Sequence, residues 1–303
     1  MNLENRTSRR GIVWLSVLLL FVVLMVLANE MTDGERFYGV APIVVIALAV
    51  VGLLQVYRAT WDYQGWGLGT RQVRGLTVGT ALYATVAVIF TGVLDLSVGP
   101  VALRPQVCIP ILFGYAFGPV VGFFSGAVGS LLGDFIAGLG VFPAWHIGVG
   151  LMGLTPGLVA GYSGRGRDPS FVSNLVVVTI AIAASIVFLH PRVPGPWTGE
   201  VQNFSFWGWA LVVGGLVMLA NSLLLEDVSV ILAAASLWGT LGILVGNGFA
   251  ALAHVWINEY SLTTALIGEF APSAATDILN LVVFTPIVLA GYRATRRRGR
   301  LRR

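Results

Sequence analysis

The sequence predicts an all-α, polytopic membrane protein, built as a bundle of about ten transmembrane helices. Two observations predict this fold class. The 303 residues are 56% hydrophobic and only 11% charged, with a mean hydropathy of +0.85, whereas soluble domains carry about 25% charged residues. The apolar residues also fall into long runs that are separated by short polar segments, as a chain that crosses a bilayer repeatedly requires.

Each of these runs approaches the ~20 apolar residues that a span needs. The expected spans are 11–28, 39–57, 75–94, 105–118, 119–138, 143–162, 171–189, 207–225, 230–256 and 272–292. We expect the first run to be a retained span, because it lacks the small-x-small pattern of a signal-peptide cleavage site. The run 105–118 would rise only about 21 Å as a helix. It either borrows residues from 98–104 or is a half-span, and Pro119 favours a break after it.

Arginine placement predicts the orientation of the bundle. All 18 basic residues are arginine, and the net charge is +4. On the ten-span layout one face receives the clusters Arg6–Arg10, Arg58–Arg74, Arg165–Arg167 and Arg293–Arg303. The opposite face receives Arg36, Arg104 and Arg192. The positive-inside rule makes the first face cytoplasmic, with both termini on it. This charge is therefore a topology signal of a multi-pass protein of the cell membrane, and no nucleic-acid partner is predicted.

The polar segments divide the chain into three parts. Residues 1–74 form a two-helix membrane preface and a cytoplasmic linker, 75–293 form the membrane core, and 294–303 form a basic cytoplasmic tail that can contact anionic lipid. Residues 190–206 carry several prolines, so we expect an irregular external loop there.

The sequence offers little for catalysis. Cys108 is the single cysteine, and the 3 histidines are too scattered for metal-ligand spacing. We find no phosphate-binding loop and no nucleophile–base–acid set. No catalytic residue, metal site or cofactor is therefore predicted, and the chain is not expected to be an enzyme.

A series of glycines runs through residues 112–138. In lipid, helices associate by close packing, which glycine permits. The fourfold spacing predicts one packing stripe along Gly114, Gly118, Gly122 and Gly126, continued by Gly129 and Gly133.

Several polar and aromatic residues fall at a similar depth in the predicted outer half of the bundle. Ionisable groups inside spans are costly and usually functional, and aromatic rings with a few polar groups suit a flat organic ligand. Glu269 lies at the same depth. The predicted substrate-binding residues are Asp134, Trp145, His146, His254, Trp256, Asp277 and Asn280.

Residues 103–162 resemble the substrate-binding S component of energy-coupling-factor (ECF) vitamin transporters, of the riboflavin type or an uncharacterised relative. The resemblance rests on "FGPVVG" (117–122), the "GD" at 133–134, the aromatic turn at Trp145 and "GLMGLTPGL" (150–158). Weaker similarity extends it to about 75–293. It implies an S-component-like core that captures a vitamin or similar small molecule from outside.

The resemblance also implies partners. An S component joins a transmembrane coupling subunit and two cytoplasmic ATPase subunits, and small residues of its first helix help this docking. The corresponding candidates here are Gly75, Gly79, Ala81 and Ala84. The usual core of the family has six spans, whereas 75–293 offers more, and the sequence does not identify the additional pair within 171–256.

Two other functions stay open. One is a membrane ligand sensor or partner-binding module with an S-like pocket. The other is an intramembrane enzyme that uses Asp134, His146, Glu269 and Asp277 for acid–base chemistry. Copurification with ATPase subunits would distinguish the transporter from both.

The predicted orientation can be tested with cysteines near the two ends of the chain. In a Cys108→Ala background, Asn5→Cys and Gly299→Cys should resist an impermeant thiol reagent in intact cells, because both ends are expected in the cytoplasm. Labelling of either cysteine from outside would contradict the ten-span layout.

Overall fold

The computed structural model describes residues 16, 19–25, 41–60, 63–94, 97–98, 101–159, 169–196, 198–228 and 230–284. The described part confirms the all-α membrane bundle, because it contains 7 helices that are long and apolar enough to cross a bilayer. They are α2 (Ala41–Ala59), α3 with its π-helical end η2 (Thr70–Ala87 and Val88–Val93), α5 (Pro119–Ile136), α7 (Pro169–Leu189), α8 (Ser205–Val228), α9 (Val230–Ile257) and a final helix (Thr264–Phe284). The final helix starts earlier than the predicted 272, with a π-helical segment η5 (Thr264–Phe270).

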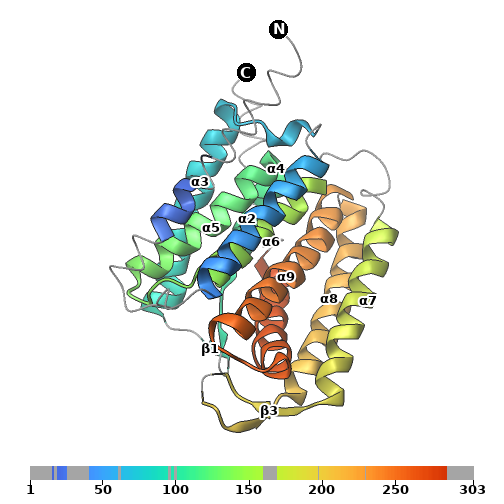
Figure 1. Cartoon of the computed structure of the whole chain (residues 1–303). Coiled ribbons are helices and arrows are strands. Elements are labelled where there is room, and N and C mark those ends of the chain that lie inside the picture. Colours follow the sequence, from blue (N-terminus) through green and yellow to red (C-terminus); the bar gives the residue numbers. More distant parts are fainter. Residues whose placement is uncertain are drawn as a thin grey trace.

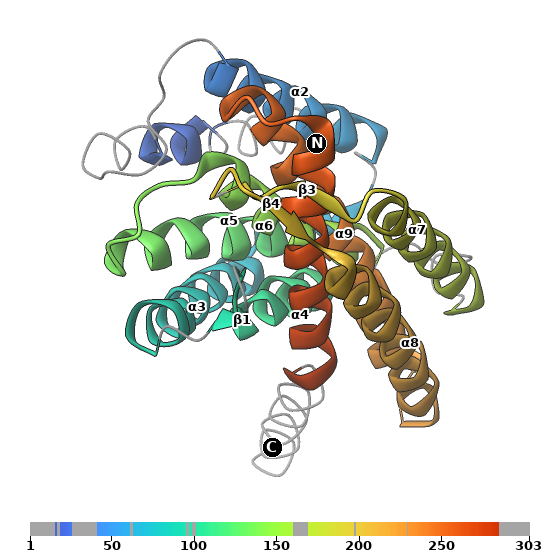
Figure 2. The same ribbon diagram turned by 90° about the horizontal axis from the view of Figure 1, so that it is seen from below.

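Two shorter helices, α4 (Cys108–Phe117) and α6 (Pro143–Val159), lie inside the bundle. Helix α5 packs against α3, α4 and α6, and α6 packs against α9. Helices α7 and α8 pack on each other and on α9, so they form a hairpin at one side of the molecule (Figures 1 and 2).

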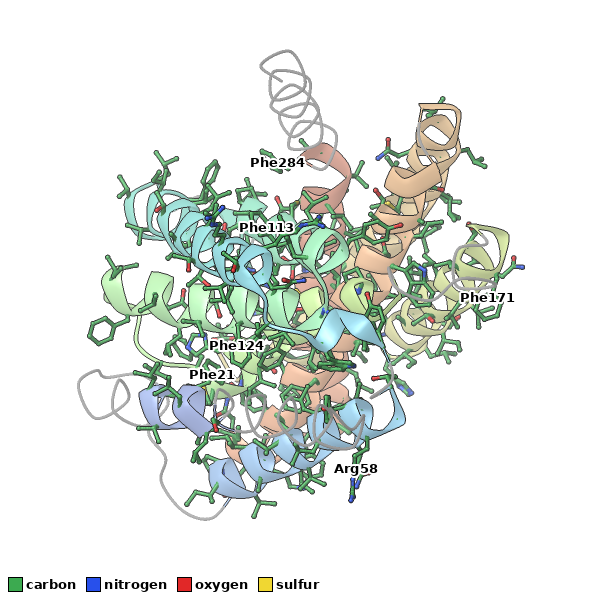
Figure 3. The ribbon with its side chains drawn as sticks, turned by 90° about the horizontal axis from the view of Figure 1, so that it is seen from above. Phe21, Arg58, Phe113, Phe124, Phe171 and Phe284 are labelled. Atoms are coloured by element: carbon green, nitrogen blue, oxygen red, sulfur yellow. The ribbon has the colours of Figure 1, made fainter. Side chains whose placement is uncertain are left out.

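The first predicted span is described only at Ser16 and at residues 19–25, which are helical. There Phe21 meets the rings of Phe123 and Phe124 of α5 edge-on, at centroid distances of 6.2 and 6.3 Å (Figure 3). The arginine clusters at 6–10, 165–167 and 293–303 lie outside the described residues.

The chain reverses direction at Gly118, which corrects the prediction of a single glycine stripe. Gly118 has φ 111°, a conformation that glycine adopts without the steric cost of a Cβ. Pro119 starts α5 directly after it. Because α4 and α5 fold back on each other, Gly114 and Gly122 face one another across the hairpin instead of lying two turns apart on one helix.

These glycines hold three helices in backbone contact. A Cβ on either Gly114 or Gly122 would strike the carbonyl of Gly153 on α6, and one on Gly126 would strike the carbonyl of Val149. Further along α5, the glycines turn towards α3: Gly129 meets the ring of Tyr83, and Gly133 meets Ala87. The series therefore serves two interfaces, first with α4 and α6 and then with α3.

The two ends of the bundle differ. At the end where α3 begins, which follows a short 3-10 helix η1 (Gln64–Trp66), Arg71 donates a hydrogen bond to the carbonyl of Ala116 (3.3 Å). Arg58, at the end of α2, lies at the rim of the bundle (Figure 3). The opposite end carries two antiparallel hairpins, β1 (Ser97–Val98) with β2 (Val101–Ala102) and β3 (Arg192–Pro194) with β4 (Val201–Asn203). The segment 190–206 is thus partly a β-hairpin and not a wholly irregular loop. We call this the outer end, following the arginine distribution.

Replacement of the buried glycines should destabilise the bundle. Gly122→Leu and Gly126→Leu place a side chain where the α6 backbone lies, and overpacking of this kind typically costs about 1–3 kcal/mol or more. The melting temperature of the detergent-solubilised protein should fall for both variants. Gly52→Leu is the matched control, because no described atom lies within 4 Å of its Cβ position. Equal melting of all three variants would contradict the packing described above.

Candidate functional site

Two helices carry facing rows of buried polar residues. On the final helix, Glu269, Ser273 and Asp277 recur every four residues and therefore share one face, with Asn280 one turn further on. The second helix is α9, which contacts the start of the final helix. Its buried polar residues Thr240, Asn247 and His254 recur every seven positions. We call this set the polar seam; its members are Glu269, Ser273, Asp277 and Asn280 on the final helix and Thr240, Asn247 and His254 on α9, all of them buried.

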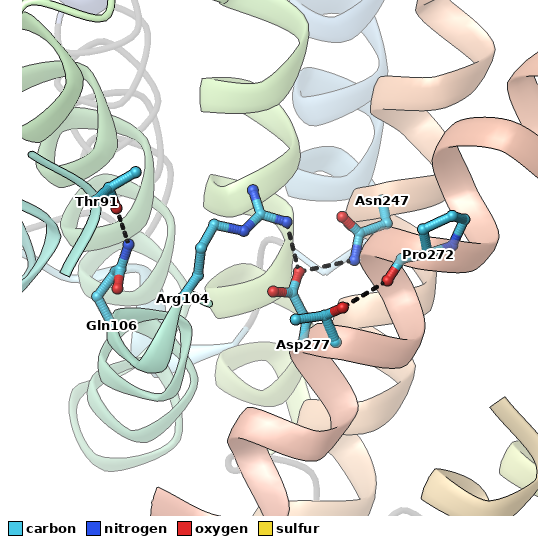
Figure 4. Close-up of polar contacts among 7 residues, drawn as sticks. Thr91, Arg104, Gln106, Asn247, Pro272 and Asp277 are labelled. Atoms are coloured by element: carbon cyan, nitrogen blue, oxygen red, sulfur yellow. Dashed lines mark hydrogen bonds and ion pairs between the residues drawn. The ribbon is translucent and has the colours of Figure 1, made fainter. Parts of the chain in front are cut away.

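The seam is centred on an ion pair. Arg104 donates a hydrogen bond through Nη2 to Oδ2 of Asp277 (3.0 Å), and Asn247 donates to the same oxygen through Nδ2 (3.0 Å; Figure 4). The side chain of Asp277 is 0% exposed and that of Arg104 is 18% exposed. A guanidinium is not deprotonated in proteins. Arg104 therefore stays charged, and Asp277 has a cation beside it.

Arg104 reaches Asp277 because the chain enters the bundle from the outer end before α4 starts. Helix α4 has 10 residues, which rise about 15 Å, and a bilayer core is about 30 Å thick. Its first turn, preceded by the 3-10 helix η3 (Pro105–Val107), therefore lies near mid-depth. Irregular backbone at this depth is tolerated where it is enclosed by protein or lines a cavity. Gln106 ties the segment to α3 through a hydrogen bond from Nε2 to Oγ1 of Thr91 (3.4 Å; Figure 4).

Aromatic side chains connect the ion pair to the outer end. The guanidinium of Arg104 lies over the Trp145 ring, 5.4 Å from its centroid. Trp145 meets the His254 ring edge-on at 5.9 Å. His254 Nδ1 lies 2.8 Å from Oε1 of Glu269, within hydrogen-bond distance. A continuous row of polar and aromatic contacts therefore runs from Asp277 to Glu269 across α6, α9 and the final helix.

Several buried polar atoms around the ion pair lack a protein partner. Such atoms are rare in folded proteins and need an explanation, for example a ligand or an ordered water. Those close in sequence or contact to the Arg104–Asp277 pair are Arg104 Nε, Gln106 Oε1, Asn247 Oδ1, Asp277 Oδ1 and Asn280 Nδ2. They include both donors and acceptors, so this part of the seam is suited to a molecule that offers hydrogen bonds of both kinds.

A second polar cluster fixes the turn between α5 and α6. His146 accepts a hydrogen bond at Nε2 from the backbone N–H of Phe142 (3.0 Å), so its proton is on Nδ1, which lies 3.1 Å from Oγ of Ser130. Oγ of Ser130 in turn donates to the carbonyl of Ala127 (3.1 Å). A neutral imidazole in this tautomer cannot accept the serine proton. The arrangement therefore braces the helix pair and is not a nucleophile–base pair.

The predicted binding residues fall into three groups. Trp145, His254 and Asp277 belong to the contact row, and Asn280 continues the seam towards the inner end of the bundle. Asp134 is close to His146 instead, with its Oδ2 3.8 Å from Nδ1 of the histidine. Trp256 is 62% exposed on the surface of the bundle, a position that suits an aromatic residue at the membrane interface.

Sequence reasoning missed Arg104 and Asn247 and left Glu269 out of the predicted set. The signals were present. Asn247 is an isolated amide seven residues before His254, and Glu269 lies two helical turns before Asp277. Arg104 could not be paired in this way, because its partner is 173 positions away in the chain.

Three of the four docking candidates on α3 point into the bundle. Gly75 packs against the ring of Phe117, Gly79 packs against Phe113 and Ser125, and Ala84 is buried. Only Ala81 is exposed. It lies on an outward face of α3 beside the exposed side chains of Val78 and Leu82.

An apolar groove of about 400 Å³ lies between α6, α7, α9 and the final helix. Trp238, Leu241 and Phe270 contribute to its walls. Its two threonines, Thr155 and Thr179, already donate their hydroxyl protons to carbonyls of their own helices. The groove therefore offers little to a polar ligand, and the polar seam is the better candidate site.

The Arg104–Asp277 pair can be tested by a double-mutant cycle. Asp277→Leu leaves a buried guanidinium without its carboxylate, and removal of one partner from a buried pair typically costs about 3–5 kcal/mol. Arg104→Met combined with Asp277→Leu should restore much of the lost thermal stability, because neither charge then stays buried alone. Additive losses in melting temperature would show that the two side chains do not interact.

Comparison with known proteins supports the resemblance seen in the sequence. Residues 68–190 match the family model described as ECF-type riboflavin transporter, S component. A UPF0397 protein of Vibrio atlanticus (strain LGP32) is 36% identical over 87 residues, which are 27% of this chain and 44% of that protein. The aligned part thus spans less than half the length of this relative. No solved structure is similar enough to support a comparison. The match includes Arg104, Trp145 and the α4–α5 hairpin, and over residues 68–190 the chain is similar to the S components of ECF-type transporters.

Proposed function

We propose that the chain is the membrane-embedded substrate-binding component of an ECF-type importer. It captures a vitamin or similar small molecule from outside the cell for ATP-driven uptake by partner subunits. The observation that carries the proposal is the Arg104–Asp277 pair, which lies at mid-depth with unpaired polar atoms around it. Charged groups inside a membrane bundle are expensive and mark substrate or ion sites.

The ligand binds, in this proposal, to the outer half of the polar seam. Trp145 offers a ring for stacking, and Arg104, Asn247 and Asp277 offer the hydrogen-bonding groups that fix orientation. The positive charge of Arg104 is already balanced by Asp277, which favours an uncharged ligand. Because the matching family model is described as a riboflavin transporter component, riboflavin is the first compound to test.

The predicted residues have different parts in this proposal. Trp145, His254 and Asp277 line the site, and Asn280 lies on its inner side. Asp134, which lies beside His146, belongs to the rim of the site in this proposal, whereas His146 positions the turn that carries Trp145. We assign Trp256 to the membrane interface.

The partners are a transmembrane coupling subunit and two cytoplasmic ATPase subunits. The outward face of α3 around Ala81 is the part of the predicted docking set that a partner can reach. In this proposal residues 75–293, from α3 to the final helix, form the membrane core. Both chain termini are cytoplasmic.

The alternative of a ligand sensor uses the same site without import. It is distinguished by the presence or absence of ATPase subunits in the purified complex. For the enzymatic alternative, the fixed tautomer of His146 removes the most obvious general base beside Ser130.

Ligand binding should depend on the outer half of the seam. Asp277→Asn and Trp145→Ala should each weaken binding about 5- to 150-fold, as expected for the loss of about 1–3 kcal/mol. Asp134→Asn should have a smaller effect because of its place at the rim. Affinities can be measured by titration calorimetry with riboflavin and with any small molecule identified by native mass spectrometry. Trp256→Ala is the control, and weakening by this variant alone would contradict the assignment.

The transport role predicts a stable complex. Affinity purification from native membranes should recover a coupling subunit and ATPase subunits, and uptake into vesicles should require ATP. Ala81→Trp should reduce recovery of these subunits without a change in ligand affinity, because it alters only the outward face of α3. Recovery of the chain alone from gently solubilised membranes, with ligand bound, would favour the sensor.

A further inference from the structure

The β3–β4 hairpin lies over the outer end of the final helix. It connects α7 to α8 and crosses the start of the final helix when the molecule is seen from below (Figure 2). Val193 of β3 and Phe204, directly after β4, are buried in the same core cluster as Ile267 of the final helix. The hairpin is therefore anchored on one side in the core.

The tip of this hairpin is held by two contacts. Tyr260 donates a hydrogen bond from Oη to the carbonyl of Pro196 (2.7 Å). The ring of Pro196 also lies against Gly268, where a Cβ would come within 2.9 Å of Cδ of the proline. Gly268 precedes Glu269 in the chain, so the hairpin tip lies next to the outermost member of the polar seam.

The backbone places Tyr260 in this position at a cost. Glu259 has φ 55°, the single positive φ at a non-glycine residue in the described part of the chain. Residues other than glycine, asparagine and aspartate adopt this conformation rarely, and it concentrates at sites where function requires it. It turns the chain back so that the N–H of Tyr260 faces the carbonyl of His254 (3.4 Å), and the two rings meet edge-on at 6.2 Å.

These contacts extend the row described above to the outer surface. From outside to inside it runs through Pro196, Tyr260, His254, Trp145, Arg104 and Asp277. We propose that Tyr260 and the tip of the β3–β4 hairpin form the outer wall of the ligand site and the point at which the ligand enters and leaves. This inference rests on the proposed function. It assigns the entrance to the hairpin that connects α7 to α8, and makes Tyr260 the residue that controls access.

The wall can be tested without knowledge of the ligand. Ser273 is buried on the same helix face as Glu269 and Asp277, so a cysteine there reports on access to the seam. The reporter Ser273→Cys is placed in a Cys108→Ser background, because a serine hydroxyl can still donate to the carbonyl of Asn280 as Cys108 does. The full chain in lipid nanodiscs is then treated with a small positively charged methanethiosulfonate reagent, and the labelling rate is followed by mass spectrometry.

Tyr260→Phe should raise the labelling rate about three- to tenfold, since it removes one hydrogen bond that closes the wall and keeps the ring. Gly268→Ala should raise it as well, because its methyl group displaces Pro196. Tyr57→Phe at the inner end of α2 is the matched control and should leave the rate unchanged. Glu200→Cys, exposed on the hairpin, provides the rate for a freely accessible thiol.

The inference is overturned if neither Tyr260→Phe nor Gly268→Ala changes the labelling rate. It is also overturned if the Ser273→Cys reporter, without either variant, already reacts as fast as the Glu200→Cys thiol, or if the reporter stays unreactive in every background. None of these outcomes decides whether the chain works with a coupling subunit, which the copurification experiment tests separately. If ATPase subunits are absent but Tyr260→Phe accelerates labelling, the proposal of an outer wall is supported and the importer role is contradicted.

Discussion

A buried ion pair between Arg104 and Asp277 is the interaction on which the organisation of this bundle depends. Two charges at the middle of a membrane protein are stable only if each is enclosed and hydrogen-bonded. Here the enclosure needs four segments: the irregular chain before α4, the first turn of α6, the middle of α9 and the final helix. Asn247 adds a hydrogen bond to the carboxylate, and Trp145 covers the guanidinium. The site exists because these segments meet at one depth.

The glycines explain how an arginine outside any long helix reaches that depth. The chain turns at Gly118 and packs α4 against α5 and α6 by backbone contact, so α4 fills only the inner half of the bundle. The segment that carries Arg104 occupies the outer half of the bundle, between the start of α4 and the outer end. The fold thus keeps one half apolar and tightly packed and places its polar groups in the other half, which under the proposed function is the half that a ligand from outside reaches first.

The sequence predicted the class of fold, most span boundaries and the break before Pro119, because hydropathy and proline are local signals. It also singled out Asp277, Trp145 and His254, which stand out as polar or aromatic residues in apolar runs. The structure places them in one row of contacts, and their role in ligand binding stays a prediction. It did not predict that Gly114 and Gly122 face each other, since a regular spacing does not reveal a reversal of the chain. The pairing of Arg104 with Asp277 was missed for a similar reason: the two lie 173 positions apart. Ala81, like Gly75 and Gly79, is a small residue of α3, and only the packing shows that Ala81 is exposed and the two glycines are buried.

In the proposed function the ligand occupies the outer half of the polar seam and contacts the Arg104–Asp277 pair. The most direct measurement is a cryo-electron microscopy structure of the protein purified gently with its bound small molecule. Ligand density is expected against the Trp145 ring, within hydrogen-bond distance of Arg104, Asn247 or Asp277 and enclosed on the outside by Tyr260. Ligand density in the apolar groove beside Trp238 and Phe270, with the Arg104–Asp277 pair untouched, would contradict this placement of the ligand.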